Sequence, residues 1–261
     1  MINKIDIIKY ANNKLSAQED AVIKEHRANI FVNGEHYISL MCLPQYLDEL
    51  AVGFLFAEKV ISSYADVVKI DAADAENIFV TVSHSADTSK TANRAIVSGF
   101  TQGSVNLPFF DCGNLPLLNS RLNISADEVI KMTALFNQRS ELFRQTGAVH
   151  SCSLILPDGT NLFYEDIGRH NAVDKIIGKA LIAGLDIKNS ILLTSGRISS
   201  EILIKAAGLG IPIIISTSAP TSMAVEIARK INLTLLGFAR GGRFNIYAGE
   251  SRIRAAAQPE C

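Results

Sequence analysis

The sequence predicts an α/β protein, α+β overall, that is divided into two domains. Its 261 residues are enough for one large core or two smaller ones. Strand-like and helix-like segments alternate over residues 124–261, which predicts a mixed sheet with helices on both faces. A smaller N-terminal α+β domain is predicted for residues 1–98, and an irregular stretch, residues 99–123, separates the two.

The N-terminal domain is expected to contain a hairpin followed by a helix. Residues 28–32 and 35–41 have the composition of strands, and the Asn33-Gly34 pair between them supplies the two positive φ angles of a tight turn. Pro44 ends the second strand, and apolar residues at helical spacing predict a helix over residues 46–59. The remaining strands of this domain are predicted at residues 67–70, 78–82 and 95–97.

Residues 99–123 are interpreted as a flexible loop because Gly and Pro residues interrupt every short pattern in them. A loop of this length is usually either functional or disordered. It carries Cys112. A thiol on an exposed loop can reach a partner, accept a sulfur atom as a persulfide and deliver it, although a lone loop cysteine can also be idle.

The C-terminal domain, residues 124–261, is predicted to open with a capping box. Ser125 and Glu128 have the required spacing, and the helix that they start runs to about residue 143. The following strands are predicted at residues 149–156, 161–164, 191–194, 213–216, 233–237 and 244–247. The helices between them are predicted at residues 171–183, 199–209 and 221–231.

Composition excludes several classes of function. A net charge of -1 provides no global basic field, so we expect no nucleic-acid partner, and any anion site must be local. No apolar run reaches the roughly 20 residues that span a bilayer, and residues 1–14 are mixed and charged, so we expect a cytoplasmic protein with no membrane partner. The cysteines match no zinc or disulfide spacing, so no protein-ligated metal is expected: they are Cys42, Cys112, Cys152 and Cys261. Cys42 and Cys152 fall in apolar strands and are expected in the core.

Polar residues gather where three predicted strands end, in residues 165–175, 195–197 and 238–243. Because open α/β sheets bind ligands beyond their strand ends, these segments predict one shared site. Arg197 places a positive charge at a predicted helix start, which the helix dipole disfavours unless an anion lies nearby. His150 precedes Ser151 and Cys152 on a predicted strand and is expected to be a core residue.

Arg240 and Arg243 flank two glycines. Backbone N–H groups there could approach a phosphate while the two guanidinium groups clamp it. The alternative is an ordinary glycine hairpin with solvated arginines. The C-terminal quarter of the chain is also basic, which favours an anionic ligand; its other bases are Arg229, Lys230, Arg252 and Arg254.

Three roles are open to His170 at the start of a predicted helix. It can act as an acid or base, order a ligand, or bond to Asp166 or Asp174 as a structural residue. Glu201 and Lys205 lie four residues apart, as in an ordinary helix ion pair.

Several motifs occur in a fixed order from about Glu25 to Tyr247. They include residues 32–34, 40–41, 49–55, 146–151 (TGAVHS), 165–175 (EDIGRHNAVDK), 195–197 (SGR), 218–221 (SAPT) and 237–240 (GFAR). Together they resemble the FdhD family of formate dehydrogenase accessory sulfurtransferases.

The resemblance implies a carrier that takes persulfide sulfur from a cysteine desulfurase and passes it to the molybdenum cofactor. That cofactor is bis(molybdopterin guanine dinucleotide), and it is then inserted into formate dehydrogenase. The resemblance also implies a cytidine-deaminase-like C-terminal fold, a homodimer, and a cofactor-binding stretch at residues 238–243 for the guanine-nucleotide part. The candidate cofactor-binding residues are Arg169, His170, Asn171, Ser195, Gly196, Arg197, Phe238, Ala239, Arg240, Gly241, Gly242 and Arg243.

Cys112 is the candidate catalytic residue, on one of two alignments. The family carries its persulfide cysteine in a glycine-rich loop, often CGxCG, and Cys112-Gly113 matches that motif directly. An ungapped alignment from residues 94–98 instead places Phe100 where the thiol is expected. The alternative function is a non-catalytic chaperone that binds the cofactor without moving sulfur. A zinc deaminase is a third reading, but the sequence lacks its H-x-E and P-C-x-x-C ligands.

Overall fold

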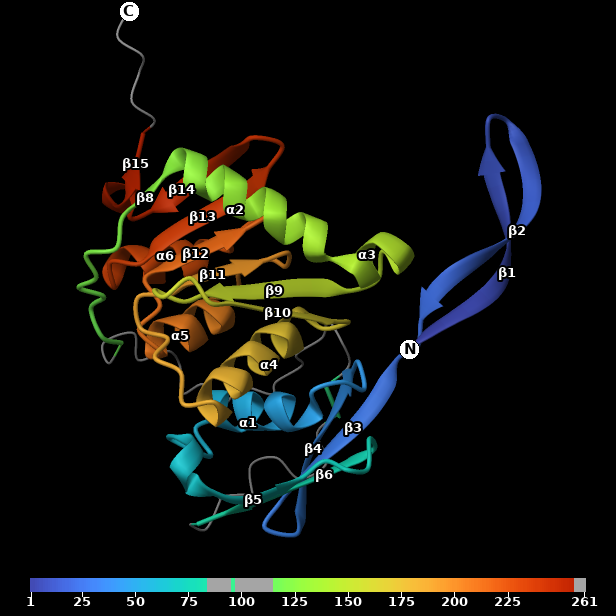
Figure 1. Ribbon diagram of the computed structural model, residues 1–261, viewed down its shortest axis with the longest axis horizontal. Coiled ribbons are helices and arrows are strands. Elements are labelled where there is room, and N and C mark those ends of the chain that lie inside the picture. The colour runs from blue at the N-terminus through green and yellow to red at the C-terminus, as the bar shows by residue number, and fades with distance from the viewer. Residues whose placement is uncertain (84–94, 97–114, 256–261) are drawn as a thin grey trace, which may run out of the picture.

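A computed structural model describes residues 1–83, 95–96 and 115–255 (Figure 1). Phe100, Cys112, Cys261 and most of the predicted loop at residues 99–123 lie outside this range. The predicted α+β architecture is confirmed, with the helices and strands arranged around separate sheets. In the described ranges, no helix combines the length and the apolar character needed to cross a bilayer.

A six-stranded mixed sheet forms the larger part of the molecule. β11, β12 and β13 are parallel, and the other pairs are antiparallel. In spatial order the strands are β10 (Asn161–Asp166), β9 (His150–Ile155), β11 (Ile191–Thr194), β12 (Ile213–Ser216), β13 (Thr234–Arg240) and β14 (Arg243–Ala248). A two-stranded parallel sheet of β8 (Ile124–Ser125) and β15 (Ile253–Arg254) lies beside it.

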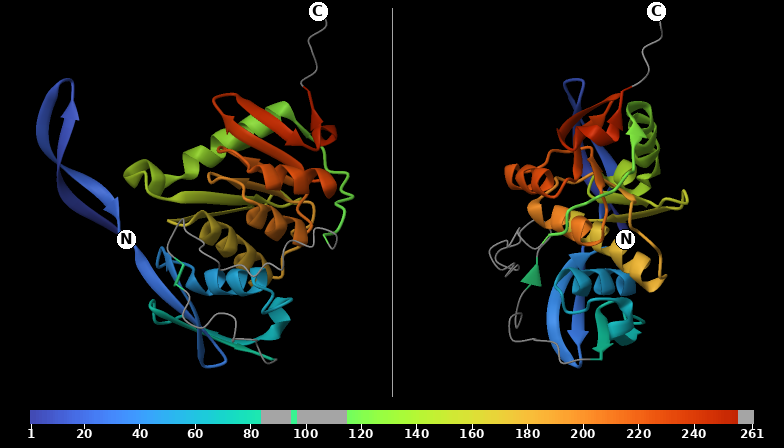
Figure 2. Two further views of the ribbon diagram at one scale, coloured as in Figure 1. Left: turned by 180° about the vertical axis from the view of Figure 1, so that it is seen from behind. Right: turned by 90° about the vertical axis from the view of Figure 1, so that its left-hand side faces the viewer.

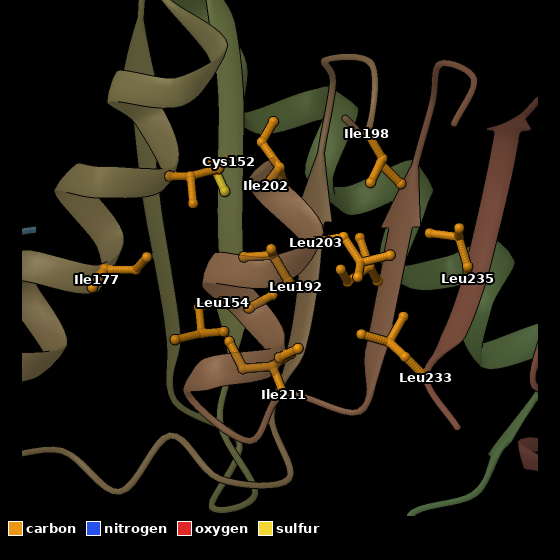
Figure 3. Packing of buried hydrophobic residues seen from close by; sticks show 14 of the residues in the cluster. Cys152, Leu154, Ile177, Leu192, Ile198, Ile202, Leu203, Ile211, Leu233 and Leu235 are labelled. Carbon is orange, nitrogen blue, oxygen red and sulfur yellow. The ribbon is translucent and has the colours of Figure 1, made fainter. Parts of the chain in front are cut away.

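Helices cover both faces of this sheet, as predicted (Figure 2). On one face lie α4 (Arg169–Ile182), α5 (Ser200–Gly208) and α6 (Ser222–Lys230), and on the other lies α2 (Ala126–Arg139). Leu192 packs toward the three helices (Figure 3), whereas its neighbour Leu193 packs toward α2. Because both faces are buried, successive strand residues are apolar, which explains the continuous apolar runs in the sequence.

A second sheet is formed by strands from the N-terminal part of the sequence, and α1 (Leu47–Ala57) packs on it. Its strands, in order, are β5 (Val67–Asp71), β6 (Asn77–Val82), β3 (His26–Val32), β4 (Glu35–Cys42) and β7 (Ala95–Ile96). The turn between β3 and β4 has positive φ at Asn33 and Gly34, as predicted. This sheet has its own hydrophobic cluster, but the domain boundaries near residues 98 and 123 stay a prediction. Short 3-10 helices cover Tyr64–Asp66 and Glu250–Arg252.

α1 and α4 pack directly on each other between the two sheets (Figure 1). A Cβ at Gly53 would lie 1.8 Å from the Asp174 carbonyl oxygen, and a Cβ at Gly178 would lie 1.8 Å from the Glu49 carbonyl oxygen. Only glycine therefore allows the two backbones to approach this closely. This contact between α1 and α4 joins the N-terminal sheet to the layer of helices that covers the six-stranded sheet.

A two-stranded ribbon of β1 (Ile2–Ala11) and β2 (Lys14–Ile23) projects from the body of the molecule (Figure 2). It was not predicted, because strands with little buried surface lack the strict apolar alternation that identifies a half-buried strand. Its outer half exposes Ile8, Tyr10 and Leu15, whose exposed fractions are 66%, 67% and 71%.

The predicted helix over residues 125–143 was wrong at its C-terminal end. α2 ends at Arg139, the backbone of Ser140 turns, and a separate helix, α3 (Glu141–Thr146), follows. The Glu165 carboxylate accepts hydrogen bonds from the backbone N–H groups of Leu142 and Phe143. A carboxylate on those free amides stabilises a new helix start. This contact comes from a residue distant in sequence, so local periodicity carried no sign of it.

Candidate functional site

The polar segments lie along one edge of the six-stranded sheet. β11, β12 and β13 are parallel, so the residues that follow them share an edge. β9 is antiparallel to β11, and β10 is antiparallel to β9, which brings the start of β9 and the end of β10 to the same edge. Residues 195–197, which follow β11, therefore lie near residues 169–171 at the start of α4 and near His150 at the start of β9.

Asp166, the last residue of β10, anchors the start of α4. Its carboxylate accepts hydrogen bonds from Lys175 Nζ at 2.6 Å and from the Leu43 backbone N–H at 3.0 Å. Asn171 Nδ2 donates both to Asp166 and to the carbonyl oxygen of Met41, each at 2.8 Å. The Asp166 and Lys175 side chains have no exposed surface. Asn171 thus points into the protein and positions the helix start, and its contact with a ligand stays a prediction.

His170 belongs to a chain of polar and charged side chains between α4 and α5. Its Nδ1 lies 3.3 Å from Glu201 Oε1, and Glu201 lies 3.4 Å from Lys205 Nζ. Lys205 also donates to the buried Asp174 carboxylate at 2.8 Å. The hydrogen bond of His170 goes to Glu201 rather than to either aspartate that the sequence suggested, Asp166 or Asp174. Glu201 and Lys205 are therefore more than the ordinary helix pair that their spacing indicated, because they connect two helices.

Glu201→Gln is expected to remove a stabilisation that depends on pH. Burial alone would raise the pKa of Glu201, but the hydrogen bond from His170 and the charge of Lys205 lower it from 4.5 to about 2. A lowered carboxylate pKa stabilises the fold fully above pH 4.5, and this contribution is lost as the pH falls toward 2. Urea unfolding at pH 6 should show a loss on the order of 3 kcal/mol for the variant.

The difference between the variant and the wild type should shrink as urea unfolding is repeated at lower pH. Glu226→Gln is the matched control, because Glu226 is exposed on α6. A difference that stays constant between pH 6 and pH 3 would contradict the assignment of the lowered pKa to this contact.

Arg169, Arg197 and His150 form what we call the basic cluster. Burial lowers the pKa of Arg169, and the positive charge of Arg197 lowers it further. Burial likewise lowers the pKa of His150, and both arginines add to this shift. Arg169 Nε is buried without a hydrogen-bond partner among the residues that the structure describes. Each positive charge in the cluster makes the charged form of its neighbours less stable, and a bound anion would offset this effect. The cluster therefore has the chemistry of an anion site.

Gly196 makes the close placement of the basic cluster feasible. A Cβ at this position would lie 2.7 Å from Arg169 Cβ, so any other residue would displace the arginine. Ser195 Oγ accepts a hydrogen bond from the Ser151 backbone N–H at 2.9 Å and lies 3.4 Å from His150 Nδ1. His150 was expected in the core and was not among the predicted site residues. It lies in the TGAVHS segment, one of the motifs that resemble the family, and that was the signal for including it.

Residues 238–243 form the end of β13 and the turn into β14. The two turn glycines have positive φ, at 59° and 76°. Arg240 and Arg243 are exposed on this turn, and Arg240 Cζ lies 6.0 Å from the centroid of the Phe238 ring. The Phe238 backbone N–H donates to the Ser218 carbonyl oxygen at 2.9 Å, which ties the turn to the loop after β12. β12 separates this turn from the basic cluster, so the two lie along the same edge without adjoining.

Part of the basic C-terminal quarter is structural. Arg252 is only 4% exposed and donates to the carbonyl oxygens of Asn232 and Leu118, both at 2.8 Å. Arg229 donates to the carbonyl oxygen of Tyr247 at 3.2 Å. The number of basic residues in the C-terminal quarter of the sequence therefore overstated the positive charge that a ligand can reach. Arg252 instead holds the 3-10 helix Glu250–Arg252 against the segment that precedes β8.

The cysteines of the described residues are both buried. Burial raises the pKa of Cys42 to about 12, and the Asp166 charge adds to this effect. Burial also raises the pKa of Cys152, which packs in the core below α4 (Figure 3). The prediction that both are core residues is confirmed. In residues 1–83, 95–96 and 115–255, no three His, Cys, Asp or Glu side chains are placed to hold a metal ion.

Comparisons with known proteins agree along nearly the whole chain. The "Sulfur carrier protein FdhD" of Bacillus pumilus (strain SAFR-032) is 37% identical over 250 residues, which cover 95% of each chain. The protein of that name from Wolinella succinogenes is 36% identical over 259 residues, covering 97% of this chain and 89% of the relative.

A solved structure shows the same fold. A crystal structure described as that of a formate dehydrogenase accessory protein from Desulfotalea psychrophila superposes with a TM-score of 0.80 at 26% identity. The superposition covers 97% of this chain and 99% of the other. The sequence profile described as the FdhD/NarQ family matches residues 23–254. The chain therefore belongs to the FdhD/NarQ family.

Proposed function

We propose that this protein is a sulfurtransferase that carries persulfide sulfur from a cysteine desulfurase to the molybdenum cofactor of formate dehydrogenase. In the first step, the Cys112 thiolate attacks the terminal sulfur of the desulfurase persulfide. A new S–S bond forms on Cys112, the donor S–S bond breaks, and the desulfurase cysteine leaves as a thiolate. In the second step bis(molybdopterin guanine dinucleotide) is bound as a substrate. The S–S bond on Cys112 would break, Cys112 would leave as a thiolate, and the outer sulfur, reduced to the sulfide level by a two-electron thiol reductant, would pass to the cofactor.

The basic cluster is the observation that carries this proposal. It brings two guanidinium groups to the edge where Ser195, Gly196 and His170 also lie, and the buried Arg169 Nε has no hydrogen-bond partner within residues 1–83, 95–96 and 115–255. Phosphate groups match guanidinium forks in charge and geometry. The exposed arginines of residues 240–243 extend this positive edge and suit a ligand that carries several phosphates, such as a dinucleotide cofactor.

The buried cysteines support Cys112 by elimination. A persulfide forms on a thiolate that a partner can reach. Cys42 and Cys152 are 0% exposed, and burial holds both thiols in their protonated form. The remaining thiols of the chain are Cys112 and Cys261. The resemblance of Cys112-Gly113 to the family motif favours Cys112 of these two.

Cys112→Ser is expected to abolish sulfur loading while the fold and anion binding stay intact. The protein is incubated with a cysteine desulfurase and cysteine, and intact-mass spectrometry then measures the added sulfur. The wild type should gain about one sulfur per chain, and the variant none. Cys261→Ser is the matched control and should load like the wild type. Equal loading of wild type and Cys112→Ser would exclude Cys112 as the carrier.

The same measurement distinguishes the second candidate function. A chaperone that only binds the cofactor would gain no sulfur, either as the wild type or as Cys112→Ser. Both proteins would still bind the phosphate groups. The cofactor would then pass to formate dehydrogenase unchanged.

We further propose that the carrier acts as a homodimer in the cytoplasm. Sedimentation of the purified protein tests the dimer, and cell fractionation tests the compartment.

A further inference from the structure

A groove of about 720 Å³ lies where the helices α1, α4 and α5 end. Its walls are three helix ends and three connecting segments, namely Phe56, Leu181, Gly208 and residues 62–64, 116–120 and 184–189. Apolar side chains form much of the wall, and exposed polar residues such as Asp186 and Lys188 border it. An apolar centre with a polar rim is the arrangement found in protein–protein interfaces.

The groove lies at the edge of the six-stranded sheet that is opposite to the basic cluster. Asn189 lines the groove two residues before β11 begins, whereas residues 195–197 follow the end of that strand. Gly210 likewise lines the groove just before β12 begins. Because β11 and β12 are parallel, both strands start beside the groove and end on the side of the basic cluster. A molecule in the groove therefore leaves the basic cluster free for an anion.

The chain that follows Cys112 is fixed at the rim of this groove. Leu115 packs against the core between the sheet and its three helices, and Pro116 lines the groove. Leu118 is buried, and its carbonyl oxygen accepts a hydrogen bond from Arg252 at 2.8 Å. Cys112 precedes Leu115 by three residues, and each residue extends a chain by at most about 3.6 Å. The two Cα atoms are therefore at most about 11 Å apart.

This short tether decides where a sulfur donor has to bind. In persulfide exchange the acceptor thiolate attacks the donor sulfur directly, so the donor cysteine must come into contact with Cys112. A protein donor then covers the surface around Leu115, and a specific interface covers about 800 Å² of each partner. Such interfaces commonly depend on a few anchoring side chains that fill a pocket near their centre. The groove is a pocket in the required place, and Leu117, which is 63% exposed, extends its apolar surface outward.

We propose that this groove is the docking site of the cysteine desulfurase, which inserts an apolar side chain between the ends of α1, α4 and α5. The inference rests on the proposed function, because it takes Cys112 as the residue that receives the sulfur. Docking holds the donor persulfide within the reach of Cys112. The cofactor is held at the opposite edge of the sheet, so the donor and the cofactor do not exclude each other.

Gly208→Trp tests the proposal by filling the groove. A Cβ at Gly208 would meet nothing within 4 Å, so this position accepts a side chain without displacing its neighbours. Sulfur on Cys112 is followed by peptide mass spectrometry with two donors, a cysteine desulfurase supplied with cysteine and, separately, glutathione persulfide. With the second donor, the Cys112 thiolate attacks the outer sulfur and glutathione leaves as a thiolate.

The two donors should respond differently to the substitution. We expect Gly208→Trp to be loaded by the desulfurase about tenfold more slowly than the wild type, because the anchoring side chain loses its pocket. Loading by glutathione persulfide should stay at the wild-type rate, because this small molecule needs no docking surface. Gly208→Ala is the matched control, since it adds a single methyl group at the same position, and it should load like the wild type from both donors.

The outcomes separate this inference from the proposed function. Equal loading of Gly208→Trp and Gly208→Ala by the desulfurase would overturn the docking site. Equal slowing with both donors would also overturn it, because the substitution would then act on Cys112 itself. If Gly208→Trp instead sediments as a monomer while the wild type is a dimer, the groove is a contact between two copies of this chain. Failure of both donors to load wild-type Cys112 would overturn the proposed function.

Discussion

Gly178→Ala is expected to be the most damaging single substitution in the helical layer. The new Cβ would lie 1.8 Å from the Glu49 carbonyl oxygen and 2.6 Å from its carbonyl carbon. These are backbone atoms of α1, so no side-chain rotation relieves the overlap, and the two helices must separate. Overpacking of this kind costs roughly 3 kcal/mol or more. Thermal unfolding followed by circular dichroism measures the loss.

Gly208→Ala is the matched control for this prediction. Gly208 is also helical, at the end of α5, but a Cβ there would meet nothing within 4 Å. This variant should be as stable as the wild type, or more stable by up to about 1 kcal/mol, because alanine has the higher helix propensity. Equal melting temperatures for the two variants would show that the helices do not depend on the glycine contact.

Lys175→Met is expected to destabilise the protein by about 3–5 kcal/mol, because it leaves the buried Asp166 carboxylate without its ionic partner. The two groups are 2.6 Å apart, and neither side chain is exposed. The substitution keeps most of the apolar volume of lysine, so the loss reports on the charge. Urea unfolding at neutral pH measures it as a shift of the midpoint.

Lys179→Met is the control for charge and helix position. Lys179 lies one turn further along α4 with its side chain 40% exposed, and its ion pair with Glu49 spans 3.4 Å. Glu49 is only 8% exposed, but the Lys179 ammonium reaches water, so this variant should lose clearly less stability than Lys175→Met. If both variants have the same urea midpoint, the buried Asp166–Lys175 pair contributes no more to the free energy of unfolding than the Lys179–Glu49 pair does.

The six-stranded sheet could be predicted well because its signals are local. The strands at residues 191–194 and 213–216 have the predicted boundaries, since each is a short apolar run between turn residues. The β3–β4 hairpin was predicted for the same reason, from its Asn-Gly turn. The ribbon at residues 2–23 was missed because it lies on the surface, where burial imposes no apolar pattern.

The site was predicted less completely than the fold. Spacing placed Arg169 and Arg197 at strand and helix ends, and the topology of the sheet brings those ends to one edge. Spacing gave no sign that Glu201 would hold His170, since the two residues lie on different helices. The partners of Asn171 were equally hidden, because the Met41 carbonyl that it bonds is 130 residues away in the chain.

The contacts of Leu43 have a consequence for insertions and deletions in this part of the chain. Its N–H and its carbonyl oxygen are both bonded, to Asp166 and to Lys175. Connections between strands and helices usually accept extra residues at little cost, because their backbone groups face water. A residue inserted between β4 and α1 would pull Leu43 away from both charges, so we expect relatives to keep the length of this connection even where its residues differ.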